Sequence, residues 1–423
     1  MTKDLQSCPF SSGKLGERFR PYEQDGMFEF LKEARESEPV FYNEELSCWV
    51  VTKKNDIQAI FRDPDRFSAS NSQSPINAFS SEVQQIMVDG HYTREPTQAN
   101  TDRPKHTRIR NISGQFLNTK RFAQYESQVR ELTRQQIATL EGKNAVDLVE
   151  AVTYELPAKV LFLLVGVPQE ESYRVKKWSD NTFNMTWGKP TEEDSIDGAR
   201  GLVEYFDFCK SVANSRLKTG LENGFDGDDY VSHLLRTRNG DDEVLSMNEV
   251  ASLIHGVLAA GHETTSNGSA SLLWALLSDR EQWQKLVKSP ALIPNAVEEG
   301  LRYMPPFITW RRLTLTDVEI GGVAIPKGSA ILMSLVSANH DEDSFECPMK
   351  FDVERKNARQ HLAFGNGIHF CMGAPLARME MKILLEELTQ RYPNMRLDEE
   401  DTIQWPLNMG FRGPVKLKVD LGE

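Results

Sequence analysis

A run of ten residues, 364–373, constrains this chain more than any other part of the sequence. It places three glycines around a single cysteine, Cys371, and glycine lets the backbone adopt positive φ or come close to another group. The segment that follows, 374–385, combines strong helix formers with apolar residues at helical spacing. Cys371 is therefore predicted at a helix N-terminus, where unpaired N–H groups and the helix dipole favour a thiolate over a thiol. A cysteine in this setting is predicted to be a nucleophile or a metal ligand.

An isolated cysteine is more often a small buried apolar residue, and this alternative holds for the other cysteines of the chain. They are Cys8, Cys48, Cys209 and Cys347. The sequence contains no CxxC pair, which argues against a zinc or iron–sulfur site. The lack of any paired spacing argues against a disulfide framework and favours a reducing compartment.

The length of 423 residues would by itself suggest two or three domains. No Gly/Ser-rich or Pro-rich linker divides the sequence, however, so we expect one domain over residues 1–423. A hydrophobic fraction of 39% and a charged fraction of 26% are those of a soluble globular protein with a sizeable core. The first residues carry no apolar signal-peptide core and no membrane span.

The net charge of −13 argues against nucleic acid as a partner. The charge is uneven, because basic residues gather within 103–110 and Asp102 is the only acid near them in the sequence. A basic patch on an acidic protein predicts a local anionic partner. A solvated helix face is the alternative.

Hydrophobic periodicity predicts a mainly α protein with a smaller β region. The helices are expected at about 118–141, at about 147–165 around Pro157, and in two pieces over about 169–222. The β candidates are 39–42, 48–52, a hairpin at 317–328 and a strand-like segment at about 395–420. Residues 68–101 lack periodicity and are expected to form a long functional loop.

Ser246 and Glu249 form a capping-box signature, which predicts the start of a helix that runs to Ser278. With about 32 residues, this helix would be roughly 48 Å long and would cross the whole molecule. Its middle places a glycine, Glu263 and Thr264 in an otherwise apolar element, although a buried unpaired glutamate is costly. Such violations are expected at functional sites. The alternative is a threonine that hydrogen-bonds back to a helix carbonyl.

The run 364–373 also matches the pattern Phe-x-x-Gly-x-His-x-Cys-x-Gly, through which the chain resembles the cytochrome P-450 superfamily. In that family this loop binds haem b, and the cysteine thiolate is the axial iron ligand. Three further motifs recur in the family's order: a His/Arg helix, the acid–threonine pair, and Glu-x-x-Arg. The resemblance implies the cytochrome P-450 fold, mainly α with a smaller β region. The haem would lie between the long central helix and the helix that follows the cysteine loop.

The resemblance also implies roles for residues of this sequence. The cofactor-binding residues are His106, Arg110, Arg312, Phe364, His369, Cys371 and Gly373, with Cys371 as the metal ligand. The catalytic proton relay is Glu263 and Thr264, and the structural residues are Glu299, Arg302 and Arg355. The substrate residues are Val257, Ala260, Phe307 and Ile308. Arg311 is adjacent to Arg312, so the propionate-binding arginine could be either residue.

A break in the helices at about 183–190 contains Phe183, Met185 and Trp187. The resemblance places this segment over the substrate pocket. An aromatic cluster is more often part of a core, and this alternative is preferred here.

The implied function is that of a bacterial, cytoplasmic haem-thiolate monooxygenase that hydroxylates or O-dealkylates a small apolar substrate, which includes aromatic compounds. The sequence looks closest to the haem domains of bacterial enzymes that fuse haem, FMN and iron–sulfur modules. Segments 38–42, 186–190 and 411–414 carry that likeness. No reductase domain is expected within residues 1–423. Electrons are therefore expected from a ferredoxin or flavodoxin-type donor that docks near 103–110, or from a reductase module absent from this chain.

Two other functions are weighed against this one. A peroxygenase that uses hydrogen peroxide directly often lacks the acid–threonine pair, which this chain keeps. A non-catalytic haem-thiolate sensor needs neither that pair nor a partner patch. Both therefore rank behind the monooxygenase.

Overall fold

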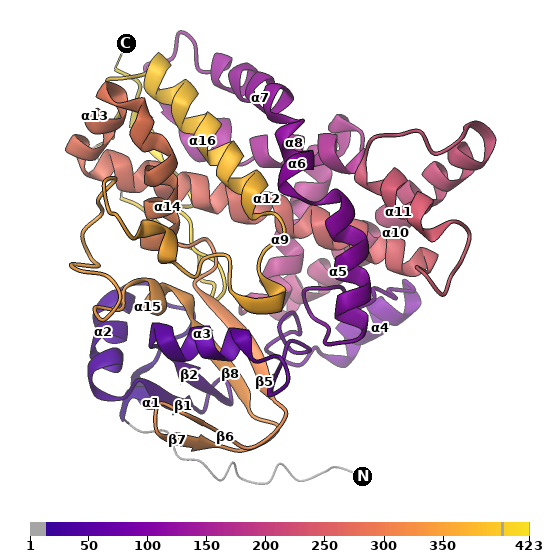
Figure 1. Ribbon diagram of the computed structural model, residues 1–423, viewed down its shortest axis with the longest axis horizontal. Helices are drawn as coiled ribbons and strands as arrows, with labels where there is room; N and C mark the ends of the chain where they lie inside the picture. The colour runs from indigo at the N-terminus through magenta and orange to yellow at the C-terminus, as the bar shows by residue number, and fades with distance from the viewer. Residues whose placement is uncertain (1–13, 399–401, 423) are drawn as a thin grey trace.

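The computed structural model describes residues 14–398 and 402–422, most of which lie in helices around one long central helix (Figure 1). The α-helices are α1 (Lys14–Arg18), α2 (Met27–Ser37), α3 (Lys54–Arg62), α4 (Ser81–Asp89), α5 (Lys105–Phe116), α6 (Thr119–Ala123), α7 (Glu126–Ala138), α8 (Leu156–Val165), α9 (Ser172–Trp187), α10 (Glu192–Asn223), α11 (Tyr230–Arg238), α12 (Met247–Ser278), α13 (Arg280–Lys288), α14 (Ile293–Tyr303), α15 (Leu335–Asn339) and α16 (Ala374–Arg391). Short helical turns of other types lie at Val149–Thr153, Gln169–Glu171, Pro290–Leu292, Ala358–Gln360 and Gly367–His369.

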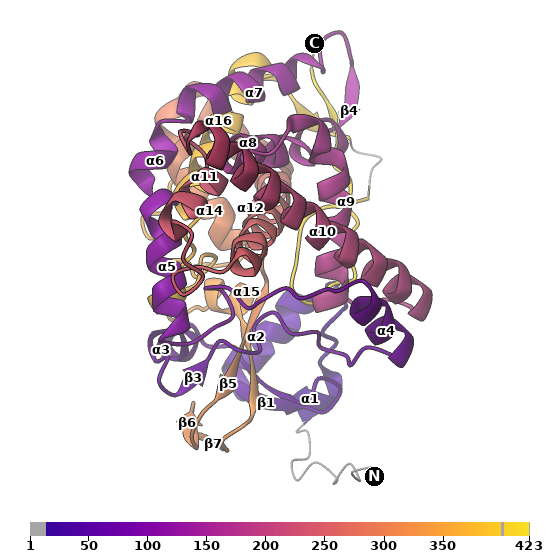
Figure 2. The same ribbon diagram turned by 90° about the vertical axis from the view of Figure 1, so that its right-hand side faces the viewer.

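The strands gather at two ends of the molecule. They are β1 (Val40–Asn43), β2 (Cys48–Val51), β3 (Phe67–Ser68), β4 (Ala145–Asp147), β5 (Thr309–Thr314), β6 (Val318–Ile320), β7 (Val323–Ile325), β8 (Ala330–Ser334), β9 (Arg396–Leu397) and β10 (Lys418–Asp420). The main sheet has the order β1-β2-β8-β5-β3, in which β2 and β8 are parallel and the other neighbours antiparallel. It lies with α1, α2 and α3 at one end of the molecule, and β4 lies at the other (Figure 2). The mainly α fold with a smaller β region is confirmed.

The long helix is confirmed as α12 (Met247–Ser278), and its capping box is formed. The N–H of Glu249 donates to Oγ of Ser246 at 3.0 Å, and the N–H of Ser246 donates to Oε2 of Glu249 at 3.1 Å. Most residues of α12 are buried on all sides, as expected of an apolar helix that crosses a core. α8 and α10 pack along it, and α14 and α16 pack against its C-terminal half.

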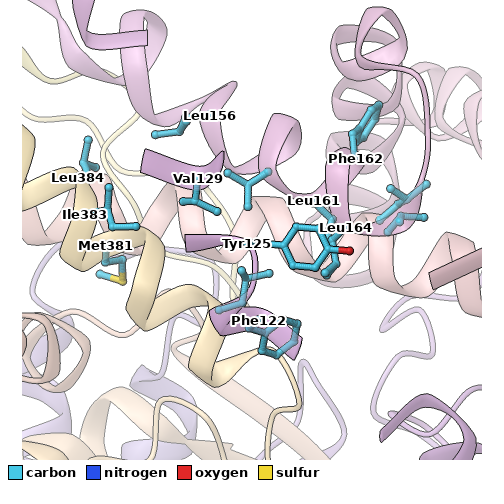
Figure 3. Close-up of a cluster of buried hydrophobic side chains, with 14 of the residues drawn as sticks. Phe122, Tyr125, Val129, Leu156, Leu161, Phe162, Leu164, Met381, Ile383 and Leu384 are labelled. Atoms are coloured by element: carbon cyan, nitrogen blue, oxygen red, sulfur yellow. The ribbon is translucent and has the colours of Figure 1, made fainter. Parts of the chain in front are cut away.

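The largest hydrophobic cluster lies around α12 and reaches into the helices that surround it. Figure 3 shows part of it, where Phe122, Tyr125 and Val129 gather near Leu161 of α8 and near Met381 of α16. This packing orders α16, whose first turn follows Cys371, relative to α12.

Three sequence expectations differ from the structure. The segment 68–101, expected as a loop, contains α4, because Val83, Ile86 and Met87 pack against α10 and Ser80 caps the helix. Only three apolar residues in a polar stretch indicate this helix, and that pattern is too weak to predict it from the sequence.

Pro157 lies in the first turn of α8. The expected helix over 147–165 is therefore a π-helical turn followed by α8.

The break between the two pieces of the segment 169–222 is shorter than expected. It covers 188–191 only, so Phe183, Met185 and Trp187 lie in the last turns of α9 and not in the break. The segment 395–420 contains the short strands β9 and β10, and residues 399–401 of it lie outside the described part, as does Cys8. Among the residues described, no helix is both long and apolar enough to cross a bilayer.

Candidate active site

A cavity of about 300 Å³ lies between α12 and α16, with the loop that precedes α16 on one side. Its lining is mainly apolar and includes side chains of α8, α9 and α12. Cys371 lines it, so the residue singled out by the sequence faces a cavity beside the central helix.

The loop before α16 presents Cys371 to this cavity through an unusual backbone. Gly365 and Gly367 have φ angles of 68° and 69°, which residues with a Cβ rarely adopt. A Cβ atom on Gly367 would also collide with the carbonyl oxygen of Phe61 on α3. The N–H of Cys371 donates to the carbonyl oxygen of Phe364 at 3.0 Å, which closes the loop. The glycines are therefore needed to fold this loop against α3.

The pKa of the Cys371 thiol is raised by burial, and the N–H groups of Gly373 and Ala374 act in the opposite direction, as does the charge of Arg110. The helix terminus thus acts on the sulfur as expected, but burial outweighs it. A metal cation at the sulfur would supply the missing stabilisation.

Basic side chains gather at one end of the cavity. Arg110, Arg312 and His369 line it, and the ring of His106 lies 4.4 Å from the ring of His369 between centroids. We call these four residues the basic cluster. Burial lowers the pKa of Arg312 to about 10 and, together with the charges of Arg312 and His106, lowers the pKa of His369 to about 3. Arg311 points elsewhere and donates to the carbonyl oxygen of Ser74 at 2.6 Å.

The basic cluster contains buried nitrogen atoms without hydrogen-bond partners. Nη2 of Arg312 and both ring nitrogens of His106 are buried and have no hydrogen-bond partner within residues 14–398 and 402–422. Buried polar groups in proteins are nearly always paired. Cationic and imidazole donors at one end of a cavity, with a cysteine on its wall, fit a haem, since its propionates would accept hydrogen bonds from this cluster.

The predicted structural residues come together in a buried ion-pair network. Nε and Nη2 of Arg302 donate to the two carboxylate oxygens of Glu299 at 2.7 and 2.8 Å. Nε of Arg355 donates to Oε1 of Glu299 at 3.1 Å. Arg302 also donates to the carbonyl oxygens of Asn339 and Pro348, so this network joins α14 to the chain that leads to the cysteine loop.

The two residues of the predicted proton relay face different surroundings. Thr264 lines the cavity, and its hydroxyl donates to the carbonyl oxygen of Ala260 at 3.0 Å. Glu263 instead points to α9 and pairs with the buried Nζ of Lys176. Burial raises the pKa of Glu263, and the charge of Lys176 opposes this effect. Lys176 in turn contacts Asp180 at 2.9 Å, and the Asp180 side chain is 41% exposed. A chain of charged groups thus leads from α12 to the surface.

Three of the four predicted substrate residues line the cavity: Val257, Ala260 and Phe307. Ile308 does not, and it packs in a separate cluster with Leu31 and Val336. Neighbouring residues of an extended chain point to opposite sides, so Phe307 and Ile308 face different spaces. The placement of Ile308 at the pocket is therefore corrected.

Other lining residues were not singled out by the sequence, or were assigned to the core. Phe183 and Trp187 line the cavity, whereas Met185 packs between α4 and α10. Leu161 lies in a helix of almost only apolar residues, and no sequence signal distinguishes its cavity position from a core position. Arg94 and His255 also line the cavity.

The comparisons with known proteins agree with this geometry. The family model described as Cytochrome P-450 matches residues 284–411. The putative cytochrome P-450 YjiB of Bacillus subtilis is 31% identical over 370 residues, which cover 87% of this chain and 88% of that protein. The 6-deoxyerythronolide B hydroxylase of Saccharopolyspora erythraea is 34% identical, over 76% of this chain and 77% of that protein.

Solved structures show the same likeness. The structure of cytochrome P-450 CREJ in complex with (4-ethylphenyl) dihydrogen phosphate has a TM-score of 0.91 and 36% identity, covering 96% of this chain and 99% of that chain. Full-length CYP116B46 from Tepidiphilus thermophilus has a TM-score of 0.91 and 34% identity, covering 96% of this chain and 54% of that chain.

The fold and the site thus define a haem-thiolate protein with haem b as its cofactor. The chain belongs to the cytochrome P-450 family, and it is a monooxygenase that needs dioxygen and a redox partner. Its likeness to the haem domains of bacterial self-sufficient enzymes, expected from the sequence, is confirmed.

Proposed function

We propose that this enzyme hydroxylates or O-dealkylates small, largely apolar substrates with an aromatic ring, using electrons from a separate ferredoxin or flavodoxin-type donor. One observation carries the proposal: a single cavity joins Cys371, the basic cluster, Thr264 and a set of aromatic side chains.

Cys371 would hold the iron on the α16 side of the cavity, and the basic cluster would hold the propionates. Phe364 and Gly373 line the same side and would border the haem. When bound, the haem supplies reductive activation of dioxygen, in which one oxygen atom enters a substrate C–H bond and the other leaves as water, with two electrons and two protons consumed. At a carbon beside an ether oxygen, the hydroxylated product breaks down to an alcohol and an aldehyde.

Thr264 and Glu263 would deliver the protons. The Thr264 hydroxyl lies at the cavity wall and would hold a proton at Oγ1 on the substrate side. Glu263 is buried beside it on α12 and would resupply that proton from solvent. The proton would pass through Lys176 and Asp180, because the described contacts of Glu263 offer no other chain of charged groups to the surface. Glu263 must exchange its bond to Lys176 for one to Thr264 or to an intervening water during this transfer.

The cavity lining supports an aromatic substrate. Phe183, Trp187 and Phe307 line one region of the cavity, and the Trp187 and Phe307 rings lie 6.0 Å apart between centroids. An aromatic ring of a substrate packs favourably against these side chains, edge to face or in an offset stack. The CREJ structure, which covers nearly the whole chain, binds an ethyl-substituted phenyl phosphate.

The basic segment 103–110 supports docking of an acidic electron donor, but less of its positive charge is free than the sequence suggested. Lys105 pairs with Glu95 at 2.7 Å, and Arg108 pairs with Glu249 at 2.5 Å, so much of the charge is neutralised within the protein. Arg103 remains exposed. Nη2 of Arg110 donates to the carbonyl oxygen of Phe370, so α5 lies against the cysteine loop, and a donor bound at α5 would dock beside the residue that would hold the iron. Residues 1–423 would act as one haem-binding unit in this scheme.

The test is the absorption spectrum of the haem-loaded protein after reduction with dithionite and addition of CO. A Soret band at the red-shifted position of thiolate-ligated haem is expected, and Cys371→His should move the band to the position of imidazole-ligated haem. A wild-type spectrum without the thiolate band would overturn the proposal. No contact among the described residues favours the peroxygenase or sensor alternative. NAD(P)H-dependent product formation with a ferredoxin and its reductase would separate the monooxygenase from both.

A further inference from the structure

One arginine that lines the cavity belongs neither to the basic cluster nor to an ion pair among the described residues. Arg94, between α4 and α5, lines the cavity, and Nη2 donates to Oε1 of Gln73 at 3.0 Å. Among the described residues no carboxylate forms an ion pair with it. The adjacent Glu95 is not available, because it pairs with Lys105. Arg94 therefore brings a positive charge to a mainly apolar cavity without a negative partner.

Further polar atoms without partners lie on the same part of the lining. Nε of Arg94, Oε1 of Gln98 and both ring nitrogens of His255 are buried and have no hydrogen-bond partner within the described ranges. His255 is 1% exposed, and its ring packs on the Tyr205 ring at 4.3 Å between centroids. Burial and, next, the charge of Arg94 hold the pKa of His255 well below its usual value, and both side chains line the cavity. Burying such polar atoms is costly unless a ligand pairs with them. Nε–H of Arg94 and one ring N–H of neutral His255 require an acceptor, whereas Oε1 of Gln98 is itself an acceptor.

The position of His255 on α12 gives the scale of a molecule that could use this set. His255 precedes Ala260 by five residues, which is about 7.5 Å along the helix axis, and the two side chains leave the helix in different directions. Arg94, His255, Ala260 and Thr264 nevertheless line the same cavity, so a group held at Arg94 leaves the rest of the molecule to extend through it over a distance of about that length. One substituted benzene ring spans a distance of that order.

We propose that Arg94, backed by His255, binds an anionic oxygen group of the substrate, a carboxylate or a phosphate, and thereby selects aromatic molecules with one charged end. The guanidinium offers charge-assisted, paired hydrogen bonds to either group. The neutral His255 ring can add one N–H donor. The inference rests on the proposed function, because it assigns one end of the substrate to that same cavity.

The experiment is isothermal titration calorimetry on the haem-loaded enzyme with three ligands of similar shape. They are 4-ethylbenzoate, 4-ethylphenyl phosphate and the uncharged 4-ethylbenzamide. In the wild type, at least one of the two anionic ligands should bind about tenfold or more tightly than the amide. The anion with the lower Kd shows whether a carboxylate or a phosphate is the preferred group. Arg94→Gln should raise the Kd of the preferred anion about 10- to 100-fold, as expected for one charged hydrogen-bonding group, and should change the Kd of the amide less than about threefold.

Three further variants keep the result interpretable. Arg94→Lys retains the charge without the paired donors and should lie between the wild type and Arg94→Gln. Arg200→Gln removes an exposed arginine of α10, whose described ion pair is with Asp197, and should leave every Kd unchanged. His255→Asn should weaken binding of the preferred anion more than that of the amide.

The failure of this inference is distinct from that of the proposed function. Equal affinity of the wild type for the amide and for both anions would overturn the inference, as would an Arg94→Gln variant that binds the preferred anion within twofold of the wild type. Haem loss from Arg94→Gln would overturn it as well, because Arg94 would then belong with the propionate ligands. A missing thiolate band in the CO spectrum overturns the proposed function, whatever the titrations show.

Discussion

At the scale of single residues, neighbours in sequence have different surroundings in this site. Arg312 faces the cavity and Arg311 does not; Phe307 lines it and Ile308 packs behind it. In the two β-region pairs the cause is the alternation of an extended chain. Sequence patterns identify the residue types that the site needs but leave the position uncertain by one residue. The pairing of β5 with β8 fixes the positions of Arg311 and Arg312, and the bridge of Phe307 with Phe411 fixes those of Phe307 and Ile308.

The same scale applies to Thr264, the member of the proton relay that lines the cavity. Thr264→Ala should retain substrate binding, since no apolar lining is lost, but should divert reducing equivalents to hydrogen peroxide. Because positioned acid–base groups contribute about 10²- to 10⁴-fold, product formed per NAD(P)H should fall at least about tenfold. The measurement is the ratio of product and of peroxide to NAD(P)H consumed. Thr264→Ser, which keeps the hydroxyl, is the matched control, and unchanged coupling in the alanine variant would remove Thr264 from the relay.

At the scale of elements, α14 and α16 are held together by a second network near the cysteine loop. Arg378 of α16 donates from Nε and Nη2 to Glu298 of α14 at 2.7 and 3.0 Å. His361, which precedes the loop, contacts the same carboxylate at 3.1 Å. Burial acts to raise the pKa of Glu298, but the hydrogen bonds from His361 and Arg378 outweigh it and lower the pKa to about 2.

This network predicts a pH-dependent stability. Since the folded pKa of Glu298 is depressed, its contribution is fully present above the unfolded value of 4.5 and is lost as the pH falls from there towards 2. Glu298→Gln should lower the free energy of unfolding by about 2 kcal/mol at pH 7, after allowance for solvent screening, and by clearly less at pH 3. Urea unfolding at both pH values measures this. Glu319→Gln, on the exposed face of β6, should change it by less than about 0.5 kcal/mol at either pH. A loss equal at both pH values would contradict the prediction.

Elements with strong periodicity were predictable, and those held by tertiary contacts were not. α12 has a capping box and an apolar run, so its start, end and role as the central helix follow from the sequence. α4 depends on contacts of three apolar residues with α10, and its local pattern, a cap at Ser80 followed by these three residues, is too short to predict the helix from the sequence alone. The bond of Glu263 to Lys176 joins α12 to α9 across 87 positions of the sequence, so the different directions of Glu263 and Thr264 could not be expected.

At the scale of the whole molecule, the strongest sequence evidence lay in motifs that the fold brings together from distant segments. Cys371, Arg312, His106 and Thr264 come from four parts of the chain and meet around one cavity. The basic segment 103–110 shows the opposite case. Its charge looked unpaired in the sequence, but Glu95 and Glu249 neutralise Lys105 and Arg108 in the fold.

This distribution of charge predicts how an electron donor approaches the molecule. Arg103→Glu reverses an exposed charge beside α5, which lies against the cysteine loop, and should slow reduction of the haem by an acidic ferredoxin several-fold at low salt. The difference should vanish near 1 M salt, where the Debye length is about 3 Å. Stopped-flow reduction over a salt series measures both effects. Lys32→Glu makes the same change of charge on α2, at the sheet end of the molecule (Figure 1), and separates a local docking effect from one of net charge. If both variants slow reduction equally, the donor senses the whole charge and does not dock at residues 103–110.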